Sequence, residues 1–109
     1  MKIFIVGAQG RMGQEIRKVI AKTRGVSFAG GIARASLGNI VVDFSQVKTK
    51  PDLMIDFSSP EMFLESLNWC VQTKTPFLSG TTGLSKKDFA KLQQAAKKIP
   101  VLWTANTSV

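Results

Sequence analysis

The sequence predicts one α/β domain, residues 1–109, built as an open and mostly parallel sheet with helices on both faces. Two observations predict it. Short apolar runs without polar alternation, which suit strands buried on both faces, alternate along the chain with segments whose apolar residues recur at helical spacing. The connections are of ordinary length, so right-handed crossovers and three layers, helix–sheet–helix, are expected.

Composition agrees with a single globular domain and excludes several classes of protein. Hydrophobic residues make up 44% of the chain and charged residues 20%, values that exclude extended disorder. No apolar run reaches the ~18 residues of a membrane span, and the apolar start is too short for a signal peptide. The single cysteine fits a reducing cytoplasm, and the absence of histidine excludes Ser-His triads and histidine-bound zinc.

The first half of the chain predicts a strand, a helix and a second strand. Lys2–Val6 and Val26–Ile32 are apolar runs typical of buried strands. Between them an apolar stripe at helical spacing ends near Gly25, which favours a helix terminus. The stripe consists of Met12, Ile16, Val19 and Ile20. Beyond the second strand the pattern is weak, although Ile40–Val42 predicts a short strand.

A further strand is predicted at Leu53–Phe57, and a helix start follows it directly. Ser58 is the expected N-cap, with Pro60 in the first turn and Glu61 three residues after the serine. The apolar stripe of this helix is Phe63, Leu64, Leu67, Cys70 and Val71. Since Cys70 lies on that stripe, a buried thiol is expected there.

The last part of the chain repeats the order of strand, helix and strand. Pro76–Ser79 predicts a strand, Ser85 opens a helix with a capping box closed by Asp88, and Val101–Trp103 predicts the final strand. Five lysines lie on the helix or just after it: Lys86, Lys87, Lys91, Lys97 and Lys98. They contribute to a net charge of 15 − 7 = +8, but no aromatic residues line the basic face of this helix, so nucleic-acid binding is only an alternative.

A glycine-rich loop, Gly7–Gly13, joins the first predicted strand to the first predicted helix. Its spacing, G-x-x-G-x-x-G, is a variant of the dinucleotide-binding fingerprint. A tight turn needs Gly7, close approach of a pyrophosphate needs Gly10, and close packing of helix on strand needs Gly13. The helix N-terminus adds N–H donors and the positive end of its dipole. The loop predicts a dinucleotide site, with a purely structural turn as the alternative.

The end of the second predicted strand indicates which dinucleotide would bind. An acidic residue there would hold the ribose 2′-OH of NAD, whereas an arginine would meet the 2′-phosphate of NADP. No acidic residue follows Ile32, but Arg34 does, and Arg11 in the glycine loop could assist it. The sequence therefore favours NADPH, with NADH possible, unless Arg34 is only a surface residue.

Four blocks of sequence, in this order, carry a resemblance to a known family: Gly7–Gly13, Asp56–Glu61, Gly80–Gly83 and Ala105–Val109. Over almost its whole length the chain resembles the N-terminal domain of the 4-hydroxy-tetrahydrodipicolinate (dihydrodipicolinate) reductases of bacterial lysine and diaminopimelate synthesis. The resemblance implies a Rossmann-like cofactor domain. A substrate and tetramerisation domain would follow beyond Val109.

The resemblance also implies which residues hold the cofactor. Those along the pyrophosphate are Gly7, Ala8, Gln9, Gly10, Arg11 and Met12. Arg34 would meet the adenosine phosphate, and Phe57 would border the cofactor. Those near the nicotinamide and its ribose are Gly80, Thr81, Thr82, Thr104, Ala105, Asn106 and Thr107.

Some positions depart from the family pattern. Ala33 stands where the family often has an acidic residue, which argues against NAD, and Thr107 stands where phenylalanine is common. The family's catalytic His-His-x-x-Lys block has no counterpart up to Val109, so no catalytic residue and no metal ligand is assigned. Asp56, at a predicted strand end, is more simply a turn or capping group than a catalytic carboxylate.

The resemblance implies a cytoplasmic, homotetrameric enzyme that reduces 4-hydroxy-tetrahydrodipicolinate to tetrahydrodipicolinate with hydride from NADPH. This chain would supply the cofactor domain and would be inactive alone. No nucleic-acid or membrane partner is expected. The alternatives are the CoA-binding domain of an acyl-CoA ligase type, an NADPH-sensing module and a nucleic-acid-binding module.

Overall fold

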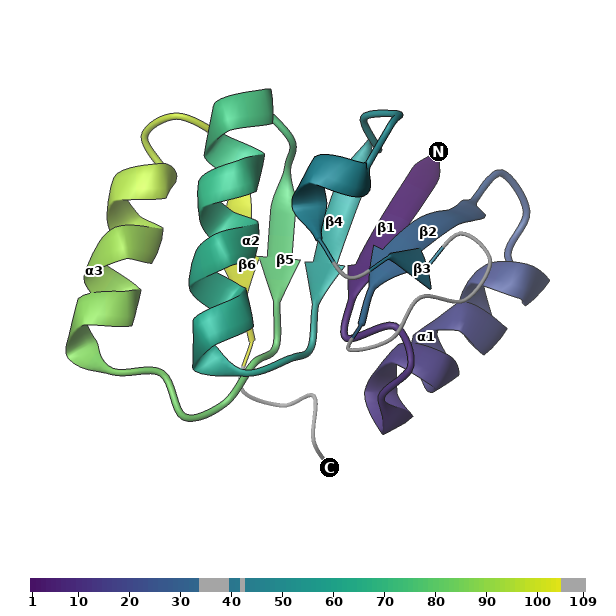
Figure 1. The fold of residues 1–109 in the computed structure, drawn as a ribbon, viewed down its shortest axis with the longest axis horizontal. Helices are drawn as coiled ribbons and strands as arrows, with labels where there is room; N and C mark the ends of the chain where they lie inside the picture. Colours follow the sequence, from purple (N-terminus) through teal and green to yellow (C-terminus); the bar gives the residue numbers. More distant parts are fainter. Residues whose placement is uncertain (34–39, 42, 105–109) are drawn as a thin grey trace.

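The computed structural model describes residues 1–33, 40–41 and 43–104. Within these residues six strands form one sheet in the order β3-β2-β1-β4-β5-β6, and every neighbouring pair is parallel (Figure 1). The strands are β1 (Lys2–Val6), β2 (Ser27–Ile32), β3 (Ile40–Val41), β4 (Leu53–Asp56), β5 (Phe77–Ser79) and β6 (Val101–Trp103). The predicted parallel, doubly wound sheet is confirmed; Val42, expected in a strand, lies outside the described residues.

The order of the strands creates a reversal between β1 and β4. The chain builds β1, β2 and β3 toward one edge of the sheet, then crosses back to β4 and continues through β5 and β6 toward the other edge. In open parallel sheets, ligands bind beyond the carboxyl ends of the strands at such a reversal. The topology therefore directs attention to the loops that follow β1 and β4.

Helices cover both faces of the sheet, as the alternating pattern predicts. They are α1 (Arg11–Lys22), the 3-10 helix η1 (Phe44–Gln46), α2 (Pro60–Thr73) and α3 (Lys86–Ala95). Figure 1 shows α2 and α3 side by side on one face, and α1 packs against the other. The result is the expected three-layer arrangement, and the capping box of Ser85 and Asp88 at the start of α3 is also confirmed.

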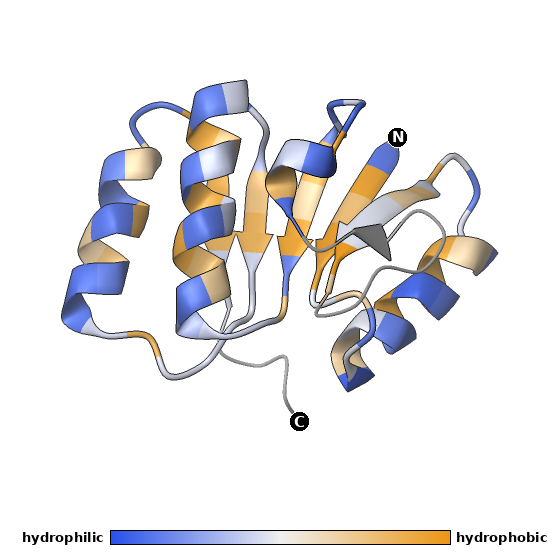
Figure 2. Ribbon diagram, in the orientation of Figure 1, coloured by the Kyte–Doolittle hydropathy of each residue, from blue (hydrophilic) through white to orange (hydrophobic). Residues whose placement is uncertain are grey.

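The two faces of the sheet bury two separate sets of side chains. Because side chains alternate along a strand, Phe4 and Val6 point toward α2 and α3, whereas Ile3 and Ile5 point toward α1. Figure 2 shows the resulting hydrophobic strands between helices whose outer sides are hydrophilic. The largest fully buried side chains on the α2 side include Phe63 and Phe77, whose rings meet edge to face at 5.7 Å.

The predicted N-cap of α2 is wrong by one residue. The helix begins at Pro60, and the capping side chain is Ser59, whose Oγ accepts from the Met62 amide at 3.3 Å. Ser58 is engaged elsewhere, since its hydroxyl donates to Asp56. This local hydrogen bond, to a residue two positions earlier, takes the Ser58 hydroxyl away from the helix start. The cap therefore moves to Ser59, and Glu61 is then two residues beyond it instead of the three that a capping box needs.

A short helix that the sequence did not predict holds the crossover from β3 to β4. Asp43 caps η1: its Oδ1 accepts from the Ser45 amide at 2.9 Å, and its own amide donates to Gln46 Oε1 at 3.1 Å. Phe44 stacks on Trp69 of α2 with ring centroids 5.7 Å apart. These contacts tie the crossover to the α2 face.

Gly13 lets α1 lie directly on the turn after β1. A Cβ on this residue would collide with the Gly7 carbonyl oxygen and would lie 2.9 Å from the Ala8 backbone. Both obstacles are backbone atoms, which cannot move aside as the end of a side chain can. The packing role that the sequence predicts for Gly13 is confirmed.

We expect Gly13→Ala to lower the free energy of unfolding by about 1–3 kcal/mol, because α1 must shift from the strand. In an ordinary helix position the same exchange would raise stability by about 1 kcal/mol. Urea unfolding followed by tryptophan fluorescence measures the change. Lys22→Ala, at the exposed end of α1, is the control and should stay within about 0.5 kcal/mol. A stabilised Gly13→Ala protein would contradict the packing argument.

Candidate functional site

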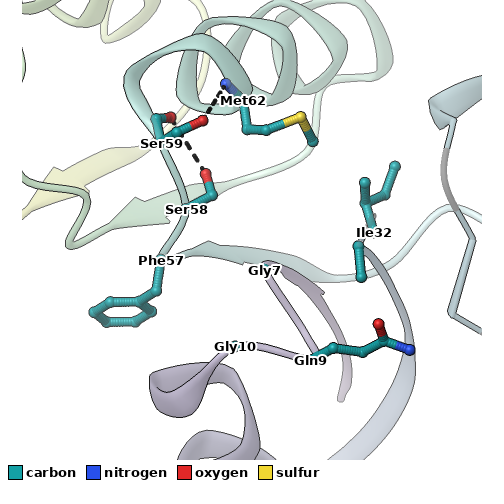
Figure 3. Close-up of a pocket in the computed structure, with 9 residues that line it drawn as sticks. Gly7, Gln9, Gly10, Ile32, Phe57, Ser58, Ser59 and Met62 are labelled. Carbon is teal, nitrogen blue, oxygen red and sulfur yellow. Dashed lines mark hydrogen bonds between the residues drawn. The ribbon is translucent and has the colours of Figure 1, made fainter. Parts of the chain in front are cut away.

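A cavity of about 590 Å³ opens at the carboxyl edge of the sheet, at the reversal between β1 and β4. Its walls come from the ends of β1, β2 and β4 and from the first turn of α2. The lining residues are Gly7, Gln9, Gly10, Ile32, Ala33, Phe57, Ser58, Ser59 and Met62. Figure 3 shows the glycine loop on one side of this cavity and the start of α2 across from it.

Gly7 allows the loop after β1 to turn sharply at the edge of the sheet. Its φ of +82° lies in the left-handed region, and a Cβ there would collide with the Phe57 carbonyl oxygen. Its amide donates to the Ile32 carbonyl at 2.8 Å. The turn is thus held between the ends of β2 and β4.

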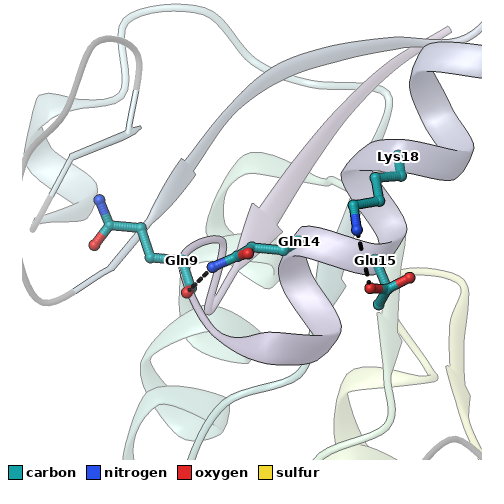
Figure 4. Close-up of polar contacts among 4 residues, drawn as sticks. All are labelled: Gln9, Gln14, Glu15 and Lys18. Atoms are coloured by element: carbon teal, nitrogen blue, oxygen red, sulfur yellow. Dashed lines mark hydrogen bonds and ion pairs between the residues drawn. The ribbon is translucent and has the colours of Figure 1, made fainter.

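Gly10 ends the turn and begins α1. Its amide donates to the Gly7 carbonyl at 3.0 Å, and a Cβ on Gly10 would meet no described protein atom closer than that oxygen, at 3.3 Å. Gln14 Nε2 donates to the Gln9 carbonyl at 2.9 Å, which fastens the middle of the loop to α1 (Figure 4). Apart from the two chain neighbours of Gly10, no described side chain lies within 4 Å of the position that its Cβ would take, so the loop exposes backbone atoms there.

Among the described residues, the N-terminus of α1 differs from those of the α-helices α2 and α3. Ser59 caps α2 and Ser85 caps α3, but Gly10 has no side chain with which to cap α1, and the first turn contains no acidic residue. Glu15, farther along α1, pairs with Lys18 at 3.3 Å on the exposed side (Figure 4). The first-turn N–H groups and the positive end of the α1 dipole are therefore left for an anion.

A buried carboxylate lies beside the cavity. Asp56, the last residue of β4, has no exposed surface, and three hydroxyls donate to it. Ser58 donates to Oδ1, while Ser79 and Thr81 donate to Oδ2 at 2.9 and 2.8 Å. Burial raises the pKa of Asp56, and the hydrogen bonds from Ser58, Thr81 and Ser79 oppose that rise.

The chemistry within reach is that of binding. The lining side chains are apolar groups, hydroxyls and one amide, which can hold a ligand but cannot act as a general acid near neutral pH.

Other reactive groups of the described residues offer no catalytic site. The thiol of Cys70 is buried, and its pKa is raised mainly by desolvation and to a smaller extent by the negative charge of Asp56. Among the described residues, no group of three potential metal ligands comes together. No helix in the described ranges is long and apolar enough to cross a membrane.

Comparison with known proteins assigns this architecture to a family. The family model described as "Dihydrodipicolinate reductase, N-terminus" matches residues 1–107. The chain belongs to this family. Its membership confirms the resemblance seen in the sequence.

Relatives named 4-hydroxy-tetrahydrodipicolinate reductase match the whole chain. The protein of Bdellovibrio bacteriovorus is 39% identical over 109 residues, and that of Anaplasma marginale is 37% identical over 125 residues. The match covers 45% and 48% of their respective lengths. The chain thus spans about half the length of the curated relatives it matches.

Solved structures agree on the fold. A dipicolinate-bound dihydrodipicolinate reductase from a Paenisporosarcina species is 20% identical, with a TM-score of 0.80 over 97% of this chain and 47% of its own. A myo-inositol 2-dehydrogenase from Lactobacillus plantarum is 14% identical, with a TM-score of 0.72 over 95% of this chain and 36% of its own. The Rossmann-like fold predicted for the family is confirmed.

The structure brings some of the predicted cofactor residues together at the cavity. Those that line it are Gly7, Gln9, Gly10 and Phe57. Ala8 is fully buried on the α1 face, and Met12 lines an apolar groove on that same side of the sheet, away from the cavity. Arg11 is exposed.

The predicted nicotinamide-side residues lie beside the cavity or outside the described part of the chain. Thr81 is buried against Asp56, Thr82 is exposed, and the Thr104 amide donates to the Ser79 carbonyl at 3.0 Å. Gly80 is buried next to them. The expectations for Arg34, Ala105, Asn106 and Thr107 fall outside the described residues.

Sequence reasoning missed three residues of the cavity wall. Ser58 and Ser59 belong to the helix start and to one of the blocks that carry the family resemblance, but no site role was predicted for them, and Met62 was not singled out. The available signal was positional: a helix that starts directly after a strand on the far side of the reversal must begin at the ligand edge of the sheet. The two contacts of Asp56 with β5 and the loop after it have no local signal.

Asp56 should make stability depend on pH. Because its folded-state pKa lies above the ordinary value of 3.8, the folded protein binds more protons between the two values, and the stability contributed by Asp56 falls as pH rises through its raised pKa. We expect the free energy of unfolding of the wild type, relative to Asp56→Asn, to increase when pH is lowered from about 8 to about 4. Urea unfolding across that range measures it; a constant or decreasing difference would contradict the burial effect.

Proposed function

We propose that this chain is the NADPH-binding domain of a 4-hydroxy-tetrahydrodipicolinate reductase. The observation that carries the proposal is the uncapped N-terminus of α1, which opens on the cavity at the reversal of the sheet. A dinucleotide has an anionic pyrophosphate flanked by two nucleosides, so it needs an anion site in the middle of an elongated cleft. The family membership supports the same reading.

We propose one orientation for the cofactor in this cavity. The pyrophosphate would lie against Gly7–Gly10 and the first turn of α1, and Ala8, Arg11 and Met12 of the same loop would contribute backbone or charge. In dinucleotide-binding folds, residues at the end of the second strand contact the ribose of the adenosine half, so that half would lie near Ile32 and Ala33. The nicotinamide half would extend toward Phe57 and the loops after β5 and β6.

The preference for NADPH rests on the sequence after β2. Ala33 offers no carboxylate to a ribose 2′-OH, and Arg34 would meet a 2′-phosphate. On the nicotinamide side we propose Gly80, Thr81, Thr82, Thr104, Ala105, Asn106 and Thr107 as the surrounding residues. NADH stays the alternative cofactor.

The whole protein would be an oxidoreductase acting on a small cyclic dicarboxylate. The bound cofactor supplies hydride, and this chain's residues bind and orient it. Substrate binding, proton donation and assembly into a tetramer would belong to the part that the relatives have beyond the matched half. A cytoplasmic location stays a prediction.

Gly10→Ala should weaken NADPH binding by about tenfold, because the added methyl group stands where the pyrophosphate approaches the backbone. Energy transfer from the two tryptophans to the dihydronicotinamide measures binding in a titration at physiological salt. Gly25→Ala is the control. Gly25 lies three residues beyond the C-terminal end of α1, and no described atom lies within 4 Å of the added Cβ. Its φ of +81° means that the exchange strains the backbone, but this strain is far from the cavity, so the variant should bind NADPH as the wild type does.

The same titration with CoA separates the function classes. Tighter binding of CoA than of NADPH by the wild type would favour an acyl-CoA ligase type of domain and contradict the proposal. A steep loss of affinity with salt, together with indifference to the nicotinamide ring, would point to a nucleic-acid-binding module.

Arg34→Ala should remove the preference for NADPH over NADH. The guanidinium would pair with the 2′-phosphate, which NADH lacks, so affinity for NADPH should fall by about tenfold while that for NADH stays unchanged. Parallel titrations with both cofactors measure the ratio. An unchanged ratio would place recognition of the 2′-phosphate elsewhere.

A further inference from the structure

The loops after β4 and β5 are joined by hydrogen bonds that converge on one carboxylate. The loop after β4 lines the cavity through Phe57, Ser58 and Ser59. The loop after β5 begins at Gly80 and lies beside it. Asp56 accepts hydroxyl hydrogen bonds from both sides: from Ser58 on the first loop, and from Ser79 and Thr81 at the second.

The hydrogen-bond network admits one direction for its protons. Thr81 Oγ1 accepts from the Ser58 amide at 2.9 Å, and Ser79 Oγ accepts from the Thr81 amide at 3.1 Å. Each hydroxyl has a single proton, which is then directed at Asp56 Oδ2, 2.8 and 2.9 Å away. The Thr81 carbonyl also accepts from Trp103 Nε1 at 3.0 Å, so β6 joins the same unit.

Asp56 itself does not face the cavity. It has no exposed surface and is absent from the cavity wall, so it can act on a ligand only through the loops that it holds. We propose that Asp56 is a positioning residue, which locks the loop after β5 to the cavity-lining loop after β4 and so preforms the surface for the nicotinamide half of the cofactor. This inference rests on the proposed function.

The proposal requires an acceptor for two hydroxyls at one atom, and it does not require a charge. Asparagine can meet this need, because its Oδ1 can take the place of Oδ2 while its Nδ2 donates to the Ser58 hydroxyl. Alanine cannot, and it would leave the buried Ser79 and Thr81 hydroxyls without their acceptor. Asp56→Asn keeps an acceptor for the two hydroxyls and Asp56→Ala does not, so comparing the two variants tests whether these hydrogen bonds are what the site needs.

The experiment uses two probes, NADPH and 2′,5′-ADP, which shares only the adenosine half, titrated by calorimetry into the folded chain. We expect Asp56→Ala to weaken NADPH binding by about tenfold or more and 2′,5′-ADP binding by less than about twofold. Asp56→Asn should stay within about threefold of the wild type for both probes. Ser79→Ala removes a hydroxyl that joins Asp56 to the Thr81 amide and that is not assigned to the cofactor site. It should reproduce the pattern of Asp56→Ala, and it provides the test if Asp56→Ala does not fold.

The matched control is Thr75→Val. Thr75 is a buried threonine two residues before the start of β5, and its hydroxyl lies 2.8 Å from that of Thr73. It should change neither affinity, although it also removes a buried hydroxyl. Equal losses for the two probes would overturn the inference, and so would unchanged binding in both Asp56→Ala and Ser79→Ala. A failure of Asp56→Asn to retain binding would overturn it as well. Wild-type protein that binds 2′,5′-ADP as tightly as NADPH would overturn it alone, whereas binding of neither probe would refute the proposed function as well.

Discussion

Close contact at the turn after β1 fixes the geometry on which the site depends. Gly7 brings the turn against the Phe57 carbonyl and the end of β2, and Gly13 lets α1 lie on that turn. Any side chain at either glycine would separate these elements, because the facing atoms are backbone. As a result, the N-terminus of α1 opens at the point where the strand order reverses.

Local patterns predicted most of the fold because they reflect local physics. The apolar run of β1, the glycine loop and the Ser85 capping box each depend on residues close together in sequence. Ser58 illustrates the limit: its pattern is a good N-cap, but its hydroxyl donates to Asp56 two residues earlier, and Ser59 caps α2 instead. The bond itself is local, whereas the complete burial of Asp56 is set by the packing of the sheet. The 3-10 helix after Asp43 was missed since its segment has little apolar periodicity.

The two sides of the candidate site also differ in how far local sequence predicts them. The side formed by Gly7–Gly10 follows from one stretch of sequence, and the structure places those glycines at the cavity. The other side joins residues that are 23 and 25 positions apart, such as Asp56 with Ser79 and Thr81. No single-sequence pattern encodes such a pairing; it follows only from the parallel register of β4 with β5. Thr81 was predicted near the nicotinamide, and its side chain turns out to be buried in the network that holds that loop.

The central claim is that the uncapped start of α1 is where the cofactor's pyrophosphate binds. The most direct test is a titration of the isotope-labelled chain with NADPH, followed through the backbone amide signals in NMR. The account predicts saturable shifts centred on Gly7–Gly13, with the serine-capped starts of α2 and α3 less affected than that loop. Shifts centred on the lysines of α3, with the glycine loop unmoved, would contradict it.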